Sequence, residues 1–174
     1  MYVNIISNAK RIGLNNITVC EDDCCFNNDF IEKYKIIKEF LDIIKEWDIF
    51  VGVLADLPED TILYKIYKYK DITFIEINKI HSMVFNIYNN RIYDTIINWN
   101  INTVSIENQI DQYIKKSNLR IIVPVPFEFS YLNVKSTLWN GNVFNEYNKL
   151  FQKSNNVIKN LIQEYLKTKE IINL

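Results

Sequence analysis

The feature of the sequence that most constrains the fold is a run of short apolar segments in the middle of the chain. Each segment has the length and the β-branched or aromatic content of a strand, and turn-like residues separate one from the next. The strands predicted in this run are residues 49–55, 62–69, 72–78, 80–88 and 91–97. Consecutive strands without helices between them are typical of an antiparallel sheet, and not of the alternating order that builds a parallel sheet.

Helices are predicted on both sides of this run. The first begins after Asn28 or Asp29, either of which can cap it. Its apolar residues recur at helical spacing, at Phe30, Tyr34, Ile37, Leu41 and Ile44. Beyond the run of strands, we expect a short helix over residues 105–116 and a long helix over residues 145–171.

The remaining segments are less regular. Residues 1–28 are expected to form a short strand followed by a loop. Residues 119–131 are predicted as a strand that Pro124 and Pro126 interrupt, because proline cannot donate to a β-ladder. The whole pattern predicts a single α+β domain over residues 1–174.

Composition excludes several classes of protein. The net charge of −1 leaves no overall basic field for nucleic acid, and the apolar runs are too short to cross a bilayer. The first residues lack the pattern of a signal peptide, so we expect a cytoplasmic protein. The cysteine count is three, an odd number that argues against a disulfide framework. Oligomeric state cannot be predicted from this sequence.

Thiol chemistry is the activity that the residue pattern favours. Cys24 and Cys25 lie just before the first long helix, whose N-terminus favours a thiolate and can hold a developing oxyanion. His81 is the only histidine, and it opens a predicted strand. Asp94 lies on the next predicted strand, after a turn at Asn89-Asn90. A carboxylate there could fix the tautomer of the imidazole, as in a catalytic triad.

Other interpretations of the same residues stay open. Cysteines near a helix start are often small buried apolar groups, and a single histidine or Asp94 can be an ordinary strand or turn residue. A zinc site built from Cys20, Cys24, Cys25 and His81 has an allowed ligand set. Adjacent cysteines, however, seldom reach one metal ion with good geometry.

Several segments together resemble the protein N-terminal glutamine amidohydrolases, a family of papain-like cysteine amidases. The segment Cys24-Cys25-Phe26-Asn27-Asn28 before a helix is similar to the family's nucleophile segment. Further segments resemble its next strand pair, its histidine-bearing strand and its acid-bearing strand: Phe50–Ala55 with Ile62–Lys65, His81–Phe85, and Arg91–Asp94. The resemblance covers roughly residues 20–135 by order and spacing. The family has Trp-Asp-Tyr directly before its histidine, where this chain has Asn78-Lys79-Ile80.

The resemblance implies a papain-like fold, with a central antiparallel sheet packed against a nucleophile-bearing N-terminal helix and a long C-terminal helix. It implies a thiol-dependent amidohydrolase that deamidates the N-terminal glutamine of proteins or peptides. Cys25 would be the nucleophile, with Cys24 as the alternative, His81 the proton-transfer group and Asp94 the residue that orients it. This chemistry requires neither a cofactor nor a metal ion, and it involves neither nucleic acid nor a membrane.

Two alternatives accompany this interpretation. One is a non-catalytic binding protein, such as a toxin-neutralising immunity protein. The other is an enzyme of the same fold: a cysteine protease, or an effector deamidase that acts on internal glutamines.

Overall fold

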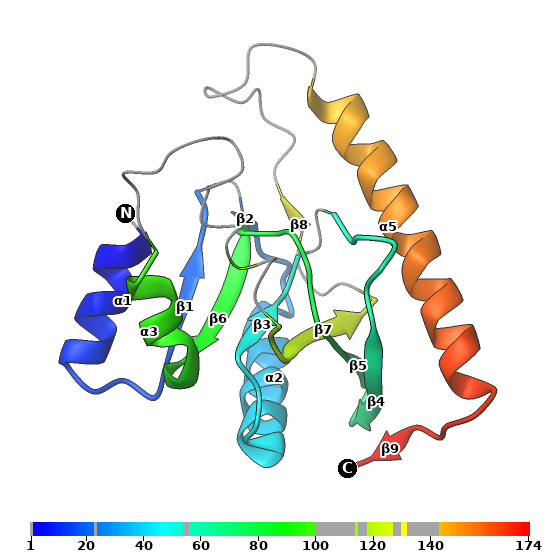
Figure 1. The fold of residues 1–174 in the computed structure, drawn as a ribbon, viewed down its shortest axis with the longest axis horizontal. Helices are drawn as coiled ribbons and strands as arrows, with labels where there is room; N and C mark the ends of the chain where they lie inside the picture. The colour runs from blue at the N-terminus through cyan, green and yellow to red at the C-terminus, as the bar shows by residue number, and fades with distance from the viewer. Residues whose placement is uncertain are drawn as a thin grey trace.

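The computed structural model describes residues 2–22, 24–53, 56–99, 114, 118–126, 130–131 and 143–174, with the side chains of 130–131, 143–149 and 151 left aside. Within these residues the protein is a mixed α+β structure built on a seven-stranded sheet (Figure 1). The helices are α1 (Tyr2–Arg11), α2 (Phe30–Ile44), η1 (Asn90–Ile92, a 3₁₀ turn), α3 (Tyr93–Ile97) and α5 (Val143–Leu166). The strands are β1 (Asn16–Cys20), β2 (Cys24–Cys25), β3 (Ile49–Val51), β4 (Leu63–Tyr69), β5 (Ile72–Ile77), β6 (Phe85–Asn89), β7 (Ile121–Val125), β8 (Ser130–Tyr131) and β9 (Ile172–Asn173).

The sheet is mixed, where the sequence predicted an antiparallel one. Its strand order is β1-β6-β3-β7-β5-β4-β9, and β2 pairs with β8 in a separate two-stranded ribbon. The pairs β3–β7 and β4–β9 are parallel, and the other pairs are antiparallel. Both parallel pairs join strands that are distant in sequence, because a parallel pairing needs a long crossover connection.

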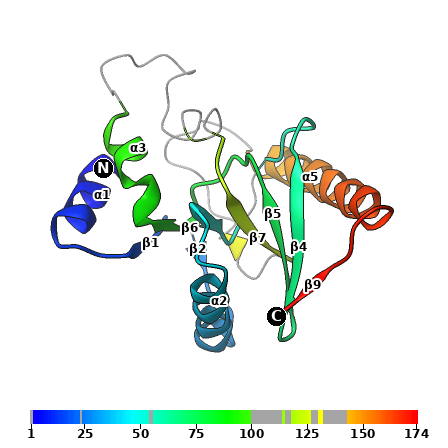
Figure 2. The same ribbon diagram turned by 60° about the horizontal axis from the view of Figure 1, so that its bottom comes forward.

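Two apolar cores lie on opposite faces of the sheet. Successive residues of β3 divide between them, with Ile49 and Val51 in one core and Phe50 in the other. The first core, with Ile49, is covered by α1, α3 and α5. The second core, with Phe50, is covered by α2. We call these the three-helix face and the α2 face. Figures 1 and 2 show α1 and α3 together at one end of the sheet and α5 along the other end.

The predicted strand at residues 91–97 is wrong, because this segment is helical. The side chain of Asn89 accepts a hydrogen bond from the Arg91 N–H, and η1 and α3 follow. Tyr93 and Ile96 are buried while Asp94 is exposed, which is the spacing of a helix face and not the alternation of a strand. The hairpin expected at Asn89-Asn90 is therefore absent from this segment, and β6 pairs instead with β1 and β3.

Other helices and strands also differ in their bounds from those predicted from the sequence. Residues 2–11 form α1, where a short strand and a loop were expected; Ile6 and Ala9 of this helix are buried against the three-helix face. The predicted strand 80–88 begins only at Phe85. The long C-terminal helix is confirmed and ends at Leu166. Apart from Ile114, the helix predicted over 105–116 lies outside the described residues. None of the described helices combines the length and apolarity needed to cross a membrane.

Candidate functional site

The cysteines and the segment that carries the histidine lie beyond the same end of the paired strands β1 and β6. β1 ends at Cys20, which pairs with Phe85, the first residue of β6. Just beyond this pair, the Glu21 N–H donates to the Val84 carbonyl at 2.9 Å, and the chain then enters β2 with Cys24 and Cys25. We call this region the thiol edge: Cys20, Cys24, Cys25 and the segment His81–Val84.

The segment His81–Val84 is irregular, yet each of its four residues is held by a hydrogen bond from another part of the fold. His81 exchanges two backbone bonds of 3.0 Å with Asp56. The other three are fixed as follows: Ser82 donates to the Val53 carbonyl, Met83 O accepts from the Tyr2 hydroxyl at 3.1 Å, and Val84 O accepts from Glu21. A segment anchored at every residue keeps the backbone of His81 at a defined place.

The residues beside His81 and the side chain of Cys24 pack against different cores. Ile80 and Leu57, which neighbour the bridge between His81 and Asp56, are both buried in the core of the three-helix face. The bridge itself is a single residue pair outside the strands, and His81 is half-buried. Cys24 packs against the core of the α2 face. Alternation along β2 directs Cys25 to the other side of its ribbon.

The structure does not bring Asp94 to His81. His81 precedes β6 and Asp94 follows it, so the two lie beyond opposite ends of a five-residue strand, about 16 Å long at the usual rise. Helix α1 spans the same interval, since Tyr2 at its start bonds to Met83 and Lys10 near its end pairs with the carboxylate of Asp94. The Asp94 side chain is 70% exposed.

Asp56 is a carboxylate that pairs with His81 through the backbone, and it is not among the site residues predicted from the sequence, because it follows the predicted strand 49–55 and carries no motif. Residues directly opposite in an antiparallel bridge have Cβ atoms about 5 Å apart. The segment after Asp56 is anchored as well, since the Leu57 N–H donates to the buried Ser154 hydroxyl of α5 at 3.0 Å. Asp56 is thus a second carboxylate to consider beside the predicted Asp94.

The thiols lie further from the start of a helix than the sequence predicts. Helix α2 begins at Phe30, and residues 26–29 separate it from Cys25. The intervening turn is closed by the Phe30 N–H donating to the Asn27 carbonyl at 3.0 Å. Aromatic rings pack beside the thiols: Phe26 lies 4.4 Å from Phe30, between ring centroids. The thiol edge therefore has an apolar flank and not a helix N-terminus directly beneath Cys25.

A zinc site is not supported at this edge. All three cysteines are free thiols, with Cys20 exposed and the other two partly buried. Within the described ranges, no group of three or more histidine, cysteine, aspartate or glutamate side chains is placed to hold a metal ion.

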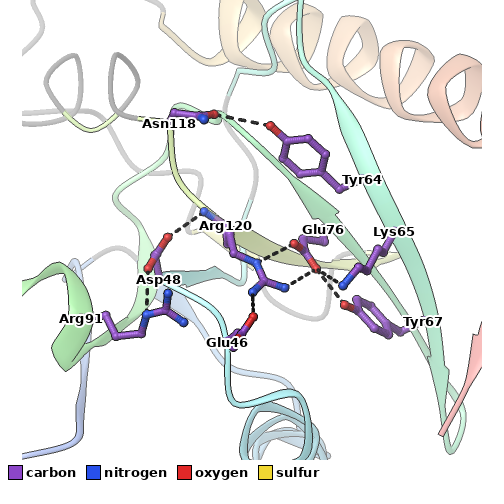
Figure 3. A network of polar contacts seen from close by, with 9 residues as sticks. All are labelled: Glu46, Asp48, Tyr64, Lys65, Tyr67, Glu76, Arg91, Asn118 and Arg120. Carbon is purple, nitrogen blue, oxygen red and sulfur yellow. Dashed lines mark hydrogen bonds and ion pairs between the residues drawn. The ribbon is translucent and has the colours of Figure 1, made fainter.

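A second polar region lies on the α2 face and is built around a buried carboxylate (Figure 3). Glu76 of β5 is 3% exposed and accepts from Arg120 Nε at 2.8 Å, from Arg120 Nη2 at 3.2 Å and from the Tyr67 hydroxyl at 2.7 Å. Lys65 Nζ lies 4.0 Å from the same carboxylate, and Arg120 also binds the exposed Glu46. We call these five residues the carboxylate network. It joins β4, β5, the start of β7 and the turn after α2.

The electrostatics of the network are those of a satisfied buried ion. Burial by itself would raise the pKa of Glu76, but the hydrogen bonds from Arg120 and Tyr67 outweigh it and hold the pKa below its ordinary value. Burial and the bond to Glu76 raise the pKa of Tyr67, and the bond to Glu76 raises the pKa of Arg120. In the sequence, the signal for this network is Glu76 itself, the one charged residue in the apolar segment Ile72–Ile77.

Comparison with known proteins does not place the chain in a family. No protein-family model matches it, and no curated protein matches it either.

Proposed function

We propose that the protein is a cysteine hydrolase that deamidates glutamine, with the N-terminal glutamine of a protein or peptide as its substrate. The observation that supports this most is that Cys24, Cys25 and the only imidazole of the chain all lie in segments beyond the same end of the paired strands β1 and β6, at the thiol edge. Thiol hydrolysis needs a nucleophile and a base held at fixed positions. A papain-like fold, membership of the N-terminal glutamine amidohydrolases and a cytoplasmic place of action belong to the same proposal.

The chemistry needs only groups of this edge and water. His81 takes the proton of the thiol, and the thiolate attacks the carbon of the side-chain carboxamide. The tetrahedral intermediate collapses, the C–N bond breaks, and ammonia leaves with the proton from His81. Water, deprotonated by His81, then attacks the thioester, which releases glutamate and restores the thiol.

The nucleophile is one of two adjacent thiols. The sequence favours Cys25, with Cys24 as the alternative. Cys24 packs against the core of the α2 face, and alternation along β2 directs Cys25 to the other side of its ribbon. For the orienting carboxylate, Asp94 pairs with Lys10 at the far end of β6, whereas Asp56 bridges to His81.

The test is ammonia release from a peptide that begins with glutamine, compared with a peptide in which the same glutamine is internal. We expect the wild-type chain to release ammonia from the first, and one of Cys24→Ala and Cys25→Ala to abolish the release while the other leaves it. Cys20→Ala is the matched control, since Cys20 is an exposed thiol of the same edge. Ammonia release at the wild-type rate in all three variants would rule out thiol catalysis by these cysteines.

A non-catalytic binding protein is the second candidate. The observation that favours it is a pair of exposed apolar side chains between Cys25 and the first turn of α2, where Phe26 is 48% and Ile31 68% exposed. Exposed apolar side chains of this size are typical of contact surfaces when they cluster. This candidate predicts that neither peptide is hydrolysed and that iodoacetamide does not alkylate Cys24 or Cys25 faster than it alkylates Cys20.

A further inference from the structure

A small cavity lies under the His81 segment, on the three-helix face of the sheet. Ser82 and Asn86 supply its polar lining, and Val51, Ile80 and Met83 are among its apolar walls. The space open to the centre of a water molecule is about 10 Å³. That is close to the volume that one water molecule requires and too small for an organic ligand.

The polar wall of this cavity contains an acceptor without a partner. Asn86 is 2% exposed, and among the described residues its Oδ1 has no hydrogen-bond partner. Its Nδ2 donates to the Ser82 carbonyl at 2.9 Å and contacts the Tyr88 hydroxyl at 3.0 Å. A carbonyl can only accept, so the bond to Ser82 fixes which end of the amide is nitrogen and which is oxygen. The unpaired atom is therefore an oxygen, and it needs a donor.

We propose that the protein holds one internal water molecule in this cavity, which donates to Asn86 Oδ1. The Ser82 hydroxyl already donates to the Val53 carbonyl, so its lone pairs can accept the second proton of the same water. Two polar partners in an otherwise apolar pocket of this size meet the requirements of a buried water site. The ligand class is fixed by the chemistry: a neutral donor of two hydrogen bonds, no larger than water.

The position of this site gives the water a structural consequence. It would link β6, through Asn86, to the hydroxyl of Ser82, the residue that directly follows His81. The same segment is already anchored to Asp56, Tyr2 and Glu21. The water would add one more hydrogen-bonded contact to this segment, on the three-helix face of the sheet. The inference concerns hydration and stability, and it stands or falls independently of hydrolase activity.

The experiment compares two substitutions in the full chain, Val51→Ile and Val123→Ile. Val51 lines the cavity, whereas Val123 is an equally buried valine of the same core on the neighbouring strand β7 and is not among the lining residues. The extra methyl at position 51 would displace the water and leave Asn86 Oδ1 unpaired. At position 123, which does not line the cavity, an extra methyl can only overpack the core, so Val123→Ile shows the cost of the same substitution without a cavity.

We expect a high-resolution crystal structure of the wild type to contain a density peak within about 3.2 Å of Asn86 Oδ1, and the Val51→Ile structure to lack it. In urea titrations, the unfolding equilibrium constant of Val51→Ile should exceed that of the wild type roughly tenfold. An empty cavity would give the opposite sign relative to the wild type, because filling a void stabilises a core. The absence of the peak, or a Val51→Ile variant at least as stable as the wild type, overturns the inference.

Discussion

The thiol edge and the carboxylate network are two regions of the described structure with functional side chains, and they are built in different ways. In the network, Glu76 is almost fully buried and accepts three hydrogen bonds from Arg120 and Tyr67. At the thiol edge, the backbone is anchored at every residue of His81–Val84, while the side chains of His81, Cys24 and Cys25 are only partly buried. In the carboxylate network, the polar side chains themselves hold the strands together. At the thiol edge, backbone hydrogen bonds hold the segment in place, and the side chains of Cys24, Cys25 and His81 stay partly accessible.

This difference separates function from stability, and single substitutions can test it. Changes at the edge should alter turnover with little effect on folding. Changes in the network should alter folding with little effect on the turnover of molecules that remain folded.

The largest effect is expected for His81→Ala. If His81 is the base of a thiol hydrolase, turnover should fall by roughly 10⁴- to 10⁶-fold, as for loss of a triad member. The backbone bonds to Asp56 do not involve the imidazole, so the urea midpoint should stay close to that of the wild type. Ammonia release and urea denaturation measure the two quantities. A variant that keeps its activity would contradict the proposed mechanism, because the chain has no other histidine.

The next largest effect is expected for Arg120→Gln, on stability. This change leaves the buried carboxylate of Glu76 without its main partner, which should cost about 3 kcal/mol in the free energy of unfolding. Glu46→Gln is the matched control, because it removes the other partner of Arg120 at a side chain that is 72% exposed. Its cost should be about 0–1 kcal/mol. Similar losses of unfolding free energy in the two variants would show that the buried pair of Arg120 with Glu76 contributes no more than the exposed pair with Glu46.

A smaller effect is expected from pH. The folded-state pKa of Glu76 lies below its ordinary value of 4.5, so the unfolded chain takes up protons first as the solution is acidified. The contribution of Glu76 to stability should therefore be complete above about pH 4.5 and be lost as the pH falls through the folded-state pKa. Urea midpoints between pH 7 and pH 3 measure it, with Glu76→Gln as the variant that should lack this component. An unchanged slope in Glu76→Gln would assign the acid sensitivity to other carboxylates.

The smallest effect is expected for Asp94→Asn. Asp94 is exposed and pairs with Lys10, so stability should change by no more than about 0.5 kcal/mol. Turnover should stay within about twofold of the wild type, because the residue lies beyond the far end of β6 from His81. Asp56→Asn, measured beside it, tests the carboxylate opposite His81. If Asp94→Asn alone lost most of its turnover, the triad predicted from the sequence would be restored.

The sequence predicted the α+β class and the two long helices, because α2 carries strong helical periodicity and α5 carries it in part. It mistook residues 91–97 for a strand, since Ile, Tyr and Thr favour strands locally and only burial against α1 reveals the helix. Because residues 91–97 were expected to pair as a strand next to the strand of His81, Asp94 was predicted as the partner of His81. Residue spacing cannot reveal that a bridge to Asp56, distant in sequence, sets the register of the histidine.

Strand β9 has a consequence for how the sheet meets other chains. It pairs in parallel with β4 at Tyr67 and Lys68, and the Leu174 N–H donates to the Lys68 carbonyl at 3.0 Å. Without it, β4 would be the outermost strand at this end of the sheet and would present unpaired backbone groups to solvent. Such an edge is a template on which strands of other molecules can add. The two residues of β9 thus shield the part of this edge at Tyr67 and Lys68 from strands of other molecules.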